Sequence, residues 1–404
     1  MTYTGLIKEE VKKSKDDLDQ VIKSKSDNYS LPRENEIGQE RTETALIVNP
    51  TSGGGSTGKD WETQYTVIKE TFGKAFGKEP HLVLTEKSGD GTTLARELLK
   101  KGYQYIIAIG GDGTINEVVN GFFVDEKANS DSSNSSETKS SDTTTQLKKN
   151  RKWKWINKDD YNTKFPRSAS MNPINPDAIL GLLPSGTRNV LAKSLDLPQD
   201  IIACINNLTK GNPKKIDVLT ATVTSSEPYD KSSKLVTRVF LNAAEIGVGA
   251  EIIDRSKKVR TKIKSRLLST IASIFVTLPT YESNVSEILL DDGREKIRTK
   301  MTMAVIANGK FLGGGFKAAP RAVFSDGLLD VVILKNSGSF KMLDDFVNIR
   351  EGDYSKEDDV IYKQAKKVSI ISKERNVTVV IDGEPIGILP ATFQVLPNAL
   401  AIRV

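Results

Sequence analysis

Three short apolar segments of this chain each run directly into a glycine-containing loop. The three pairs of segment and loop are residues 45–48 with 49–55, residues 105–109 with 110–114, and residues 178–183 with 184–189. Apolar runs of this length that stop at glycine or proline are typical of strands buried in a parallel sheet. Other segments of the region alternate between helical and strand patterns, at 61–72, 81–84, 92–100, 115–120, 190–195 and 201–208. The alternation predicts an α/β domain in which helices cover a parallel sheet.

The loop at residues 110–114, with the sequence GGDGT, has the composition of a phosphate-binding turn. Its three glycines let the backbone approach a ligand closely, and the helix expected to follow has an N-terminus that attracts anions. Asp112 stands between the glycines without a packing role, and a carboxylate beside phosphate is useful where a metal ion or a proton is handled. A tight turn capped by Asp112 is the alternative interpretation. Because the carboxyl ends of parallel strands meet at one edge of the sheet, we expect the three loops to converge on one ligand.

The first glycine loop partly fits two known phosphate-binding patterns and completes neither. Residues 53–58 fit G-x-G-x-x-G, but no acidic residue stands about 20 positions later at the end of the next strand. Asp60 stands where the P-loop pattern requires a Ser or Thr hydroxyl for magnesium. What remains is a flexible turn whose backbone N–H groups can cradle phosphate. A plain structural turn is the alternative.

Changes in composition suggest the domain boundaries. Residues 1–44 are a charged extension, and the first domain at 45–208 is interrupted at 124–177 by an insertion that we expect to be largely disordered. Strand-like runs with turn signals follow and predict an antiparallel β domain at 209–385. Residues 386–404 are expected to form C-terminal strands that return to the first domain. The strands expected in the second domain are residues 216–223, 235–242, 285–290, 301–306, 329–334, 368–371 and 377–381.

Composition narrows the class of protein. The formal net charge of +6 and the isoelectric point near 9.0 permit an anionic partner without choosing one. Cys204 is the single cysteine and His81 the single histidine, which excludes an intramolecular disulfide and a thiolate metal cluster. No apolar run reaches the roughly 18 residues of a spanning helix, and the charged start has no apolar signal core. We therefore expect a cytoplasmic protein.

A basic segment followed by an apolar one points to a membrane surface. Residues 255–266 contain seven Lys and Arg side chains, and residues 267–276 are apolar at helical spacing. Each basic residue near an anionic lipid surface contributes roughly 1 kcal/mol to binding. A solvated charge run before a buried core helix is the alternative. We expect peripheral association with an anionic membrane and no nucleic-acid partner.

Seven motifs together resemble the diacylglycerol kinase catalytic-domain family, which includes sphingoid-base kinases and bacterial lipid kinases. In chain order they are NPTSG at 49–53, GGDGTINEVVNG at 110–121, LPSGTRN at 183–189, NAAEIG at 242–247, GGGFKAAP at 313–320, FSDGLLD at 324–330 and IDGEP at 381–385. The resemblance implies a NAD-kinase-like or diacylglycerol-kinase-like α/β domain followed by an antiparallel β-sandwich. It also implies a lipid kinase that uses ATP and magnesium to transfer the γ-phosphoryl group to a lipid hydroxyl.

The resemblance also assigns roles to residues. ATP binding is implied for Asn49, Pro50, Thr51, Ser52, Gly53, Thr85, Gly110, Gly111, Asp112, Gly113, Thr114, Ile115, Asn116, Glu117 and Thr187. The expected catalytic residues are Asp382, Glu384 and Asp112. Of these, Asp382 or Glu384 is implied as the proton acceptor, and we expect magnesium near Asp112 or Glu384. A structural magnesium is implied at Asp326 with backbone oxygens of Val323 and Leu328. For the Asp-Gly pairs at 326 and 382, an ordinary hairpin turn is the alternative.

Other functions stay open on the sequence. A NAD kinase shares the GGDGT loop and the Asn116-Glu117 pair, but the Gly-Ser-Thr-Ala-Tyr type of signature expected in its second domain is missing. A catalytically inactive lipid-binding protein on the same fold would not need three intact carboxylates. The sequence does not choose the acceptor lipid, since diacylglycerol, a sphingoid base, a prenyl-type lipid and phosphatidylglycerol each need only an apolar pocket and one hydroxyl. We also allow for a homodimer.

Overall fold

The computed structural model describes most of the chain beyond the N-terminal extension. The described residues are 43–52, 56–125, 165–198, 200–225, 235–249, 251–252, 273, 277, 281–336, 341, 351–354, 358–373 and 376–404. Several expectations lie outside them: the N-terminal extension, the Ser- and Thr-rich part of the insertion, Gly53, and nearly all of the basic and apolar segments at 255–276.

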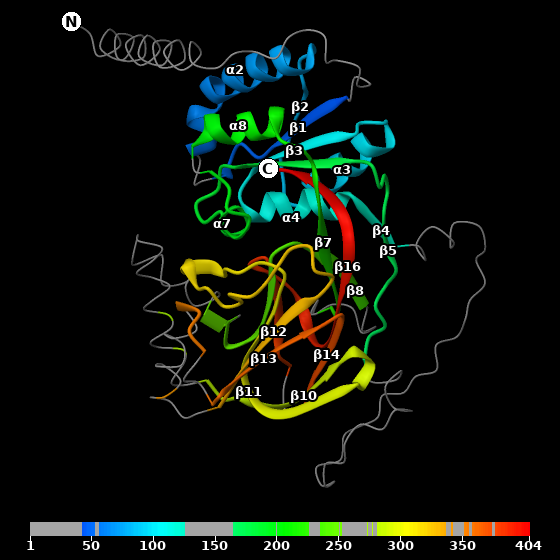
Figure 1. Ribbon diagram of the computed structural model, residues 1–404, viewed down its shortest axis with the longest axis vertical. Coiled ribbons are helices and arrows are strands. Elements are labelled where there is room, and N and C mark those ends of the chain that lie inside the picture. Colours follow the sequence, from blue (N-terminus) through cyan, green and yellow to red (C-terminus); the bar gives the residue numbers. More distant parts are fainter. Residues whose placement is uncertain are drawn as a thin grey trace, which may run out of the picture. The chain divides into compact units, whose positions relative to one another are not determined.

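The first part of the described chain forms an α/β lobe (Figure 1). Its elements are β1 (Thr44–Val48), α2 (Ser56–Phe76), β2 (His81–Leu84), α3 (Asp90–Lys100), β3 (Tyr105–Gly110), α4 (Asp112–Gly121), β4 (Phe123–Asp125), β5 (Met171–Pro173), β6 (Ile179–Pro184), α7 (Val190–Ser194) and α8 (Ile201–Lys210). β1 pairs in parallel with β2 and β3, and β3 pairs in parallel with β6. This order brings the ends of β1, β3 and β6 to the same edge of the sheet.

Helices cover both faces of these strands. On one face, Phe72 of α2 and Leu208 of α8 pack against side chains of β1 and β3. On the other face, Leu98 of α3 and Val118 of α4 pack against the alternate side chains of the same strands. Strands buried on both faces must be apolar throughout, which explains why the segments that form β1, β3 and β6 carry no charged residue.

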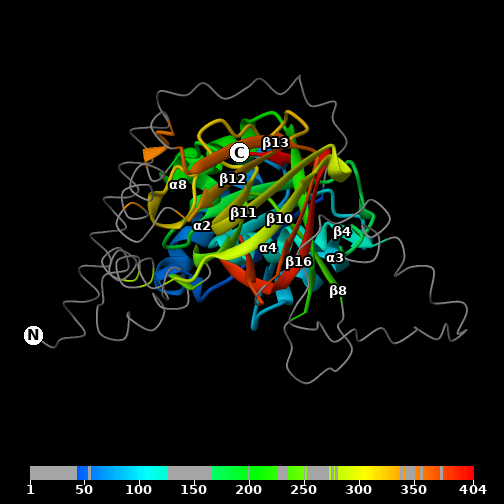
Figure 2. The same ribbon diagram turned by 90° about the horizontal axis from the view of Figure 1, so that it is seen from below.

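The rest of the described chain forms a β lobe. Its strands are β7 (Lys214–Thr224), β8 (Leu235–Phe240), β9 (Ala243–Gly247), β10 (Asn284–Leu290), β11 (Glu295–Ala307), β12 (Leu329–Lys335), β13 (Val360–Ala365), β14 (Lys367–Ser372), β15 (Thr378–Ile381) and β16 (Glu384–Arg403), with short 3-10 turns η5 (Asp291–Gly293) and η6 (Gly313–Gly315). All pairings among these strands are antiparallel. Figure 2 shows β10, β11 and β12 lying side by side. A large apolar core joins them, with Phe240 and Phe393 among its largest side chains, and a second apolar cluster includes Val305 of β11 and Val332 of β12.

Strand β16 connects the two lobes. Its first residues pair with β15, its middle pairs with β14 and β7, and Ala401 near its end pairs in parallel with Ile179 of β6. One strand is therefore hydrogen-bonded to both lobes.

The structure departs from the expected elements in the β lobe. β9 and β13 were not expected at all, and the segment expected as one strand at 235–242 ends at Phe240, with β9 beginning at Ala243. Leu241 and Asn242 leave the strand pairing because their N–H groups, with that of Ala243, donate to the Asp382 carboxylate. The helix expected at 115–120 already begins at Asp112.

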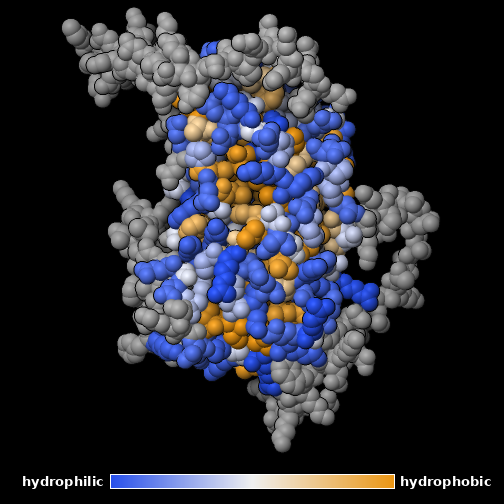
Figure 3. Space-filling model, viewed as in Figure 1, coloured by the Kyte–Doolittle hydropathy of each residue, from blue (hydrophilic) through white to orange (hydrophobic). Residues whose placement is uncertain are grey.

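The surface of the described residues is mostly polar. Hydrophobic side chains reach it in patches among hydrophilic ones on the face shown in Figure 3. Leu84, Leu235 and Val323 are the large hydrophobic side chains that are exposed in the described part of the chain. No described helix combines the length and the apolar character that crossing a bilayer demands.

Candidate active site between the two lobes

The three glycine loops contact one another at the ends of their strands. Asn49 after β1 donates from its Nδ2 to Thr114 Oγ1 at 3.0 Å. The Gly111 N–H donates to Ser52 Oγ at 3.3 Å, and the Ser185 N–H donates to the Gly110 carbonyl at 2.9 Å. The expected convergence of the loops is therefore found in the described residues.

This close approach requires glycine at two positions. A Cβ atom on Gly186 would lie 2.4 Å from Gly111 Cα, which no side chain tolerates. A Cβ atom on Gly110 would lie 2.6 Å from Thr114 Cβ, inside the first turn of α4. The loops after β3 and β6 thus pack backbone against backbone and leave N–H groups at the N-terminus of α4, an arrangement that favours phosphate.

Asp112 bridges two of the loops. Its Oδ1 accepts the Leu191 N–H at 3.1 Å in the first turn of α7. Its second oxygen accepts no hydrogen bond within the described residues. One oxygen therefore fixes the third loop and the other is available to a ligand.

Asp382 is the most heavily bonded carboxylate of the site. Its Oδ1 accepts the N–H groups of Asn242 and Ala243 at 3.2 and 3.0 Å. Its Oδ2 accepts Asn116 Nδ2 at 3.0 Å and the Leu241 N–H at 3.2 Å. Burial raises the pKa of Asp382 above its usual range, and the nearby Asp112 carboxylate adds to that rise, while the hydrogen bonds oppose it. Asp382 also has φ of 47°, which Asp tolerates better than most residues in a tight turn.

Helix α4 joins the lobes through two asparagines. Asn116 reaches Asp382, and Asn120 exchanges two hydrogen bonds of 2.9 and 3.0 Å with the backbone of Val239 on β8. Exposed Glu384 approaches the same helix from the β lobe, since a Cβ atom on Gly113 would lie 3.8 Å from its Oε1. Asp382 and Glu384, which follow Asp112 by 270 and 272 positions in the sequence, are thus gathered with it around the start of α4.

Other residues expected in the nucleotide site have different environments. Glu117 accepts hydrogen bonds from Ser88 Oγ, Gly89 N and Gly91 N at 3.2, 2.9 and 3.1 Å, so its carboxylate caps α3. Ile115 is 2% exposed and packs in the core between sheet and helices. Both side chains contact the fold around the loops, and their roles in ATP binding stay predictions.

The remaining residues of that set lie at the loop edge. Thr85 is buried where β2 ends, and its N–H donates to the Val48 carbonyl. Thr187 and Thr51 are exposed, and Thr51 donates from its N–H and its hydroxyl to Asn49 Oδ1. Pro50 is half-buried beside them. Their roles in ATP binding stay predictions.

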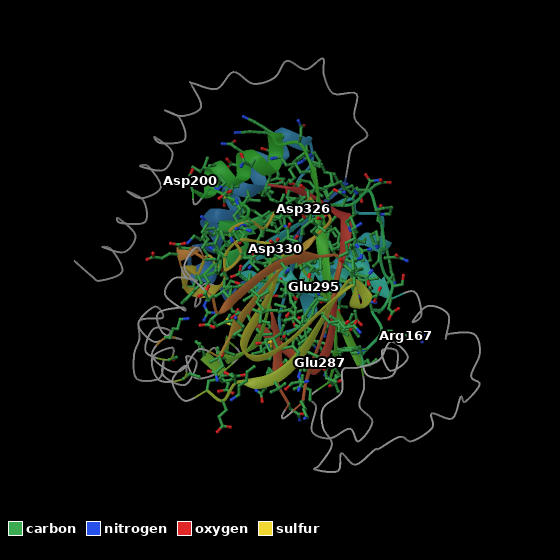
Figure 4. All side chains as sticks on the ribbon, turned by 60° about the horizontal axis from the view of Figure 1, so that its bottom comes forward. Arg167, Asp200, Glu287, Glu295, Asp326 and Asp330 are labelled. Carbon is green, nitrogen blue, oxygen red and sulfur yellow. The ribbon has the colours of Figure 1, made fainter. Side chains whose placement is uncertain are left out.

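The loop predicted to hold a structural magnesium is fixed by a buried carboxylate. Asp217, which is fully buried on β7, accepts the Gly327 N–H and the Asn398 N–H, both at 2.7 Å. Asp326 is exposed and accepts the Leu328 N–H at 3.0 Å (Figure 4). In the described residues no three His, Cys, Asp or Glu side chains form a metal-binding group. A set of one carboxylate and two backbone oxygens is nevertheless of the oxygen type that magnesium takes.

Three charged residues at or near the site were not assigned a role from the sequence. Asp217 could have been noticed as a charged residue inside an apolar strand pattern. Glu245 on β9 and Arg188 after β6 stand within quoted motifs, but nothing in their spacing shows that they interact. The electrostatic interaction between them appears only in three dimensions.

Comparison with known families matches both lobes. The diacylglycerol kinase catalytic domain matches residues 43–150 and 163–221, and the YegS C-terminal NAD kinase beta sandwich-like domain matches residues 242–404. A diacylglycerol kinase from Staphylococcus saprophyticus is 25% identical over 365 residues, covering 87% of this chain and 92% of that protein. One from Staphylococcus epidermidis is 26% identical over 366 residues, covering 90% and 92%.

Solved structures share the fold. A crystal structure of a diacylglycerol kinase from Bacillus anthracis str. Sterne matches with a TM-score of 0.57 and 21% identity, covering 89% of this chain and 96% of that one. Another structure from the same strain matches with a TM-score of 0.61 and 23% identity, with the same coverage. Fold and relatives together define a kinase at the level of the family. The chain belongs to the diacylglycerol kinase catalytic-domain family, with a YegS-type β-sandwich as its C-terminal part.

Proposed function

We propose that this protein is an ATP-dependent lipid kinase that transfers the γ-phosphoryl group of ATP to a lipid hydroxyl in the cleft between the lobes. The observation that carries the proposal is the position of Asp382. This carboxylate comes from the β lobe, yet Asn116 of the α4 helix binds it next to the glycine loops that are proposed to bind phosphate. A carboxylate held at that point can serve an acceptor bound by one lobe and a nucleotide bound by the other.

The α/β lobe supplies the nucleotide site. The backbone N–H groups of residues 110–114 and the N-terminus of α4 attract the phosphates, and the loops after β1 and β6 close around them. Phosphoryl transfer asks the protein mainly for positioning and for neutralisation of charge, because negative charge spreads over the transferred group. A backbone fixed by these hydrogen bonds provides the positioning.

The carboxylates fit a magnesium ion in this site. Asp112 has an oxygen without a hydrogen bond among the described residues, and Glu384 is exposed close to Gly113. Both offer the hard oxygen ligands that magnesium prefers. When bound, the ion would offset the charge of the terminal phosphates.

Asp382 is proposed to accept the proton of the attacking hydroxyl. Its raised pKa makes it a better base than an ordinary aspartate. The carboxylate now accepts four hydrogen bonds, and the proton takes the place of one of them. The two longest, from Leu241 N and Asn242 N at 3.2 Å, are the ones that we expect to be lost first. The same bonds aim the carboxylate, so the residue both positions the cleft and takes part in the reaction.

The acceptor is proposed to be diacylglycerol, a sphingoid base or a related lipid at an anionic membrane surface. Relatives named diacylglycerol kinase support the lipid class. The basic segment expected to dock on the membrane lies outside the described residues, so this part of the proposal rests on its seven basic side chains.

Transfer of label from γ-labelled ATP tests the proposed function. The protein is incubated with magnesium and a panel of vesicle-borne lipids, with NAD as the competing acceptor. Label in at least one chloroform-soluble lipid and none in NAD is expected. Label in NAD, or in no acceptor, would overturn the proposal.

A further inference from the structure

Glu245 presents a carboxyl group on the side of β9 that faces away from the sandwich core. Its neighbours Ala244 and Ile246 belong to that core. Side chains alternate along a strand, so Glu245 shares the opposite side with Ala243. There the adjoining strands β11 and β15 place Val305 and Val380 beside it. The carboxyl group therefore lies at the margin of an apolar layer rather than on a polar surface.

The site around Glu245 is shaped to hold this carboxyl group. A Cβ atom on Gly249 would lie 2.8 Å from Glu245 Oε2 and 3.5 Å from Met303 Cε, so glycine leaves the space that both side chains use. Gly313 lies beside Arg188, since a Cβ atom there would be 3.7 Å from Arg188 Nη1, an ordinary contact distance. Glycines thus flank both charged groups.

Two charges from opposite sides of the cleft act on Glu245. Arg188, from the third glycine loop, attracts a negative charge there, and Asp382 repels it. The facing residues Val305 and Met303 of β11 are uncharged. Burial outweighs Arg188 and raises the pKa of Glu245 to about 7. The carboxyl group is therefore close enough to the third glycine loop and to the proposed proton acceptor for the charges of both to act on it.

Glu245 differs from the other carboxylates of this region in having no hydrogen-bond donor. Asp382 accepts four hydrogen bonds and Glu117 accepts three. In the described part of the chain, no hydrogen bond reaches Glu245. Glu245 is half-buried, so its carboxyl group without a protein donor stays open to a donor that a bound ligand supplies.

We propose that Glu245 binds a second hydrogen-bond donor of the lipid acceptor, a hydroxyl or an ammonium group next to the hydroxyl that is phosphorylated. The inference rests on the proposed lipid kinase function. Ala243, whose N–H holds Asp382, is two residues from Glu245, or about 7 Å along the strand. The charge of Asp382 acts directly on Glu245, so the two carboxyl groups are near enough to serve neighbouring groups of one headgroup. The substrate class is then a polyol or amino-alcohol lipid rather than a lipid with a single hydroxyl.

The test compares three acceptors in identical mixed micelles. Diacylglycerol offers one hydroxyl, phosphatidylglycerol two, and sphingosine adds an amine. Initial rates give kcat and KM for the full-length protein and for the Glu245→Ala, Glu245→Gln and Glu295→Gln variants. Glu295 is an exposed residue of β11 paired with Lys363, and its variant is the matched control.

We expect the unmodified protein to favour at least one two-donor lipid over diacylglycerol by 10-fold or more in kcat/KM, since a site built to bind a donor rejects an analogue that lacks it. Glu245→Ala should reduce kcat/KM for that lipid at least 10-fold, mainly through KM, and change diacylglycerol less than about 3-fold. Glu245→Gln, which keeps an acceptor oxygen but no charge, separates the two donors. It should retain most activity if the donor is a hydroxyl and lose it if the donor is an ammonium group.

Each remaining outcome decides against the inference. A preference for diacylglycerol, equal losses for all lipids in both Glu245 variants, or no change in either variant overturns it while the lipid kinase function stands. If the unmodified protein phosphorylates none of the lipids, both the function and the inference fail. Thermal unfolding of each variant identifies a loss that arises from misfolding. If Glu245→Ala does not fold, the preference of the unmodified protein among the three lipids decides, and a preference for diacylglycerol overturns the inference.

Discussion

Asn116 Nδ2 lies 3.0 Å from Asp382 Oδ2 and donates a hydrogen bond to it across 266 positions of sequence. Asn116 is one turn into α4, the helix that begins within the GGDGT loop, and Asp382 begins the turn between β15 and β16. The bond therefore couples the proposed phosphate site directly to the proposed proton acceptor. A hydrogen bond to a charged group contributes about 1.5 to 3 kcal/mol, enough to fix the relative position of the two side chains.

Replacing Asp382 by Asn should abolish turnover while ATP still binds. The amide cannot take the hydroxyl proton, and its NH2 group would face N–H donors that now bind a carboxylate. We expect kcat to fall at least 100-fold with the Kd for a non-hydrolysable ATP analogue within about 3-fold, measured by calorimetry. The melting temperature should also fall. Retained turnover would remove Asp382 from the chemistry.

Replacing Gly186 by Ala should damage the nucleotide site, because the new Cβ would meet Gly111 Cα at 2.4 Å and force the two loops apart. ATP affinity should drop at least 10-fold, with a stability loss of about 1 to 3 kcal/mol. Gly73→Ala within α2 is the matched control, since a Cβ there meets nothing within 4 Å and helix propensity favours Ala by about 1 kcal/mol. Equal ATP affinity in the two variants would mean that the loops do not need their close approach.

Replacing Glu117 by Ala should lower stability more than it lowers catalysis. Its carboxylate caps α3 through the N–H groups of Gly89 and Gly91, and loss of such a cap costs about 1 to 2 kcal/mol. Urea unfolding measures the loss, and Glu97→Ala on the exposed side of α3 is the control, with almost none expected. A 100-fold fall in ATP affinity at unchanged stability would instead indicate that Glu117 binds the nucleotide.

The charge of Glu245 should make stability depend on pH. Folding raises its pKa from 4.5 to about 7, so the folded protein holds a proton that the unfolded chain has released between those values. The free energy of unfolding contributed by this group is fully present below about pH 4.5 and is lost as the pH rises to 7. Glu245→Gln does not titrate, and its stability relative to the unmodified protein should increase by about 1 to 3 kcal/mol between pH 5 and pH 8. Urea unfolding at both values measures the change, and a constant difference would contradict the raised pKa.

The sequence contained enough information for most of the α/β lobe. Residues 45–48, 81–84 and 105–109 were expected as strands and are found as β1, β2 and β3 within one residue at each end. Short apolar runs that end at glycine or proline predict buried strands at these positions. The convergence of the loops followed from the same pattern.

Strand β16 could not be predicted at its full length because it contains breaks in the usual strand pattern. Its 20 residues include three prolines, Pro385, Pro390 and Pro397. Pro390 and Pro397 fall where the register with β7 shifts, between Ile388 and Ala391 and between Leu396 and Leu400, and Pro385 lies beside the register shift with β15. Proline lacks the N–H that a ladder needs, so it is tolerated only at such irregularities, and in sequence it reads as the end of a strand.

The contacts of neighbouring residues on α4 were also beyond the sequence. Successive residues of a helix point about 100° apart, so Asn116 can meet Asp382 while Glu117 turns towards α3. The motif that contains both residues does not say which one meets the cleft. Glu245 is a similar case, because its surroundings come from β11, β15 and the loop after β6.

Single-turnover transfer from γ-labelled ATP into a lipid tests the central claim most directly. Enzyme in excess of ATP is mixed with magnesium and lipid vesicles, and label in the chloroform phase is followed for the unmodified protein and for Asp382→Asn at equal ATP occupancy. Transfer in one exponential phase by the unmodified protein, with a rate at least 100-fold lower in Asp382→Asn, is the expected result. Equal rates in the two proteins, or release of labelled phosphate without any labelled lipid, would contradict a cleft in which Asp382 serves phosphoryl transfer to a lipid.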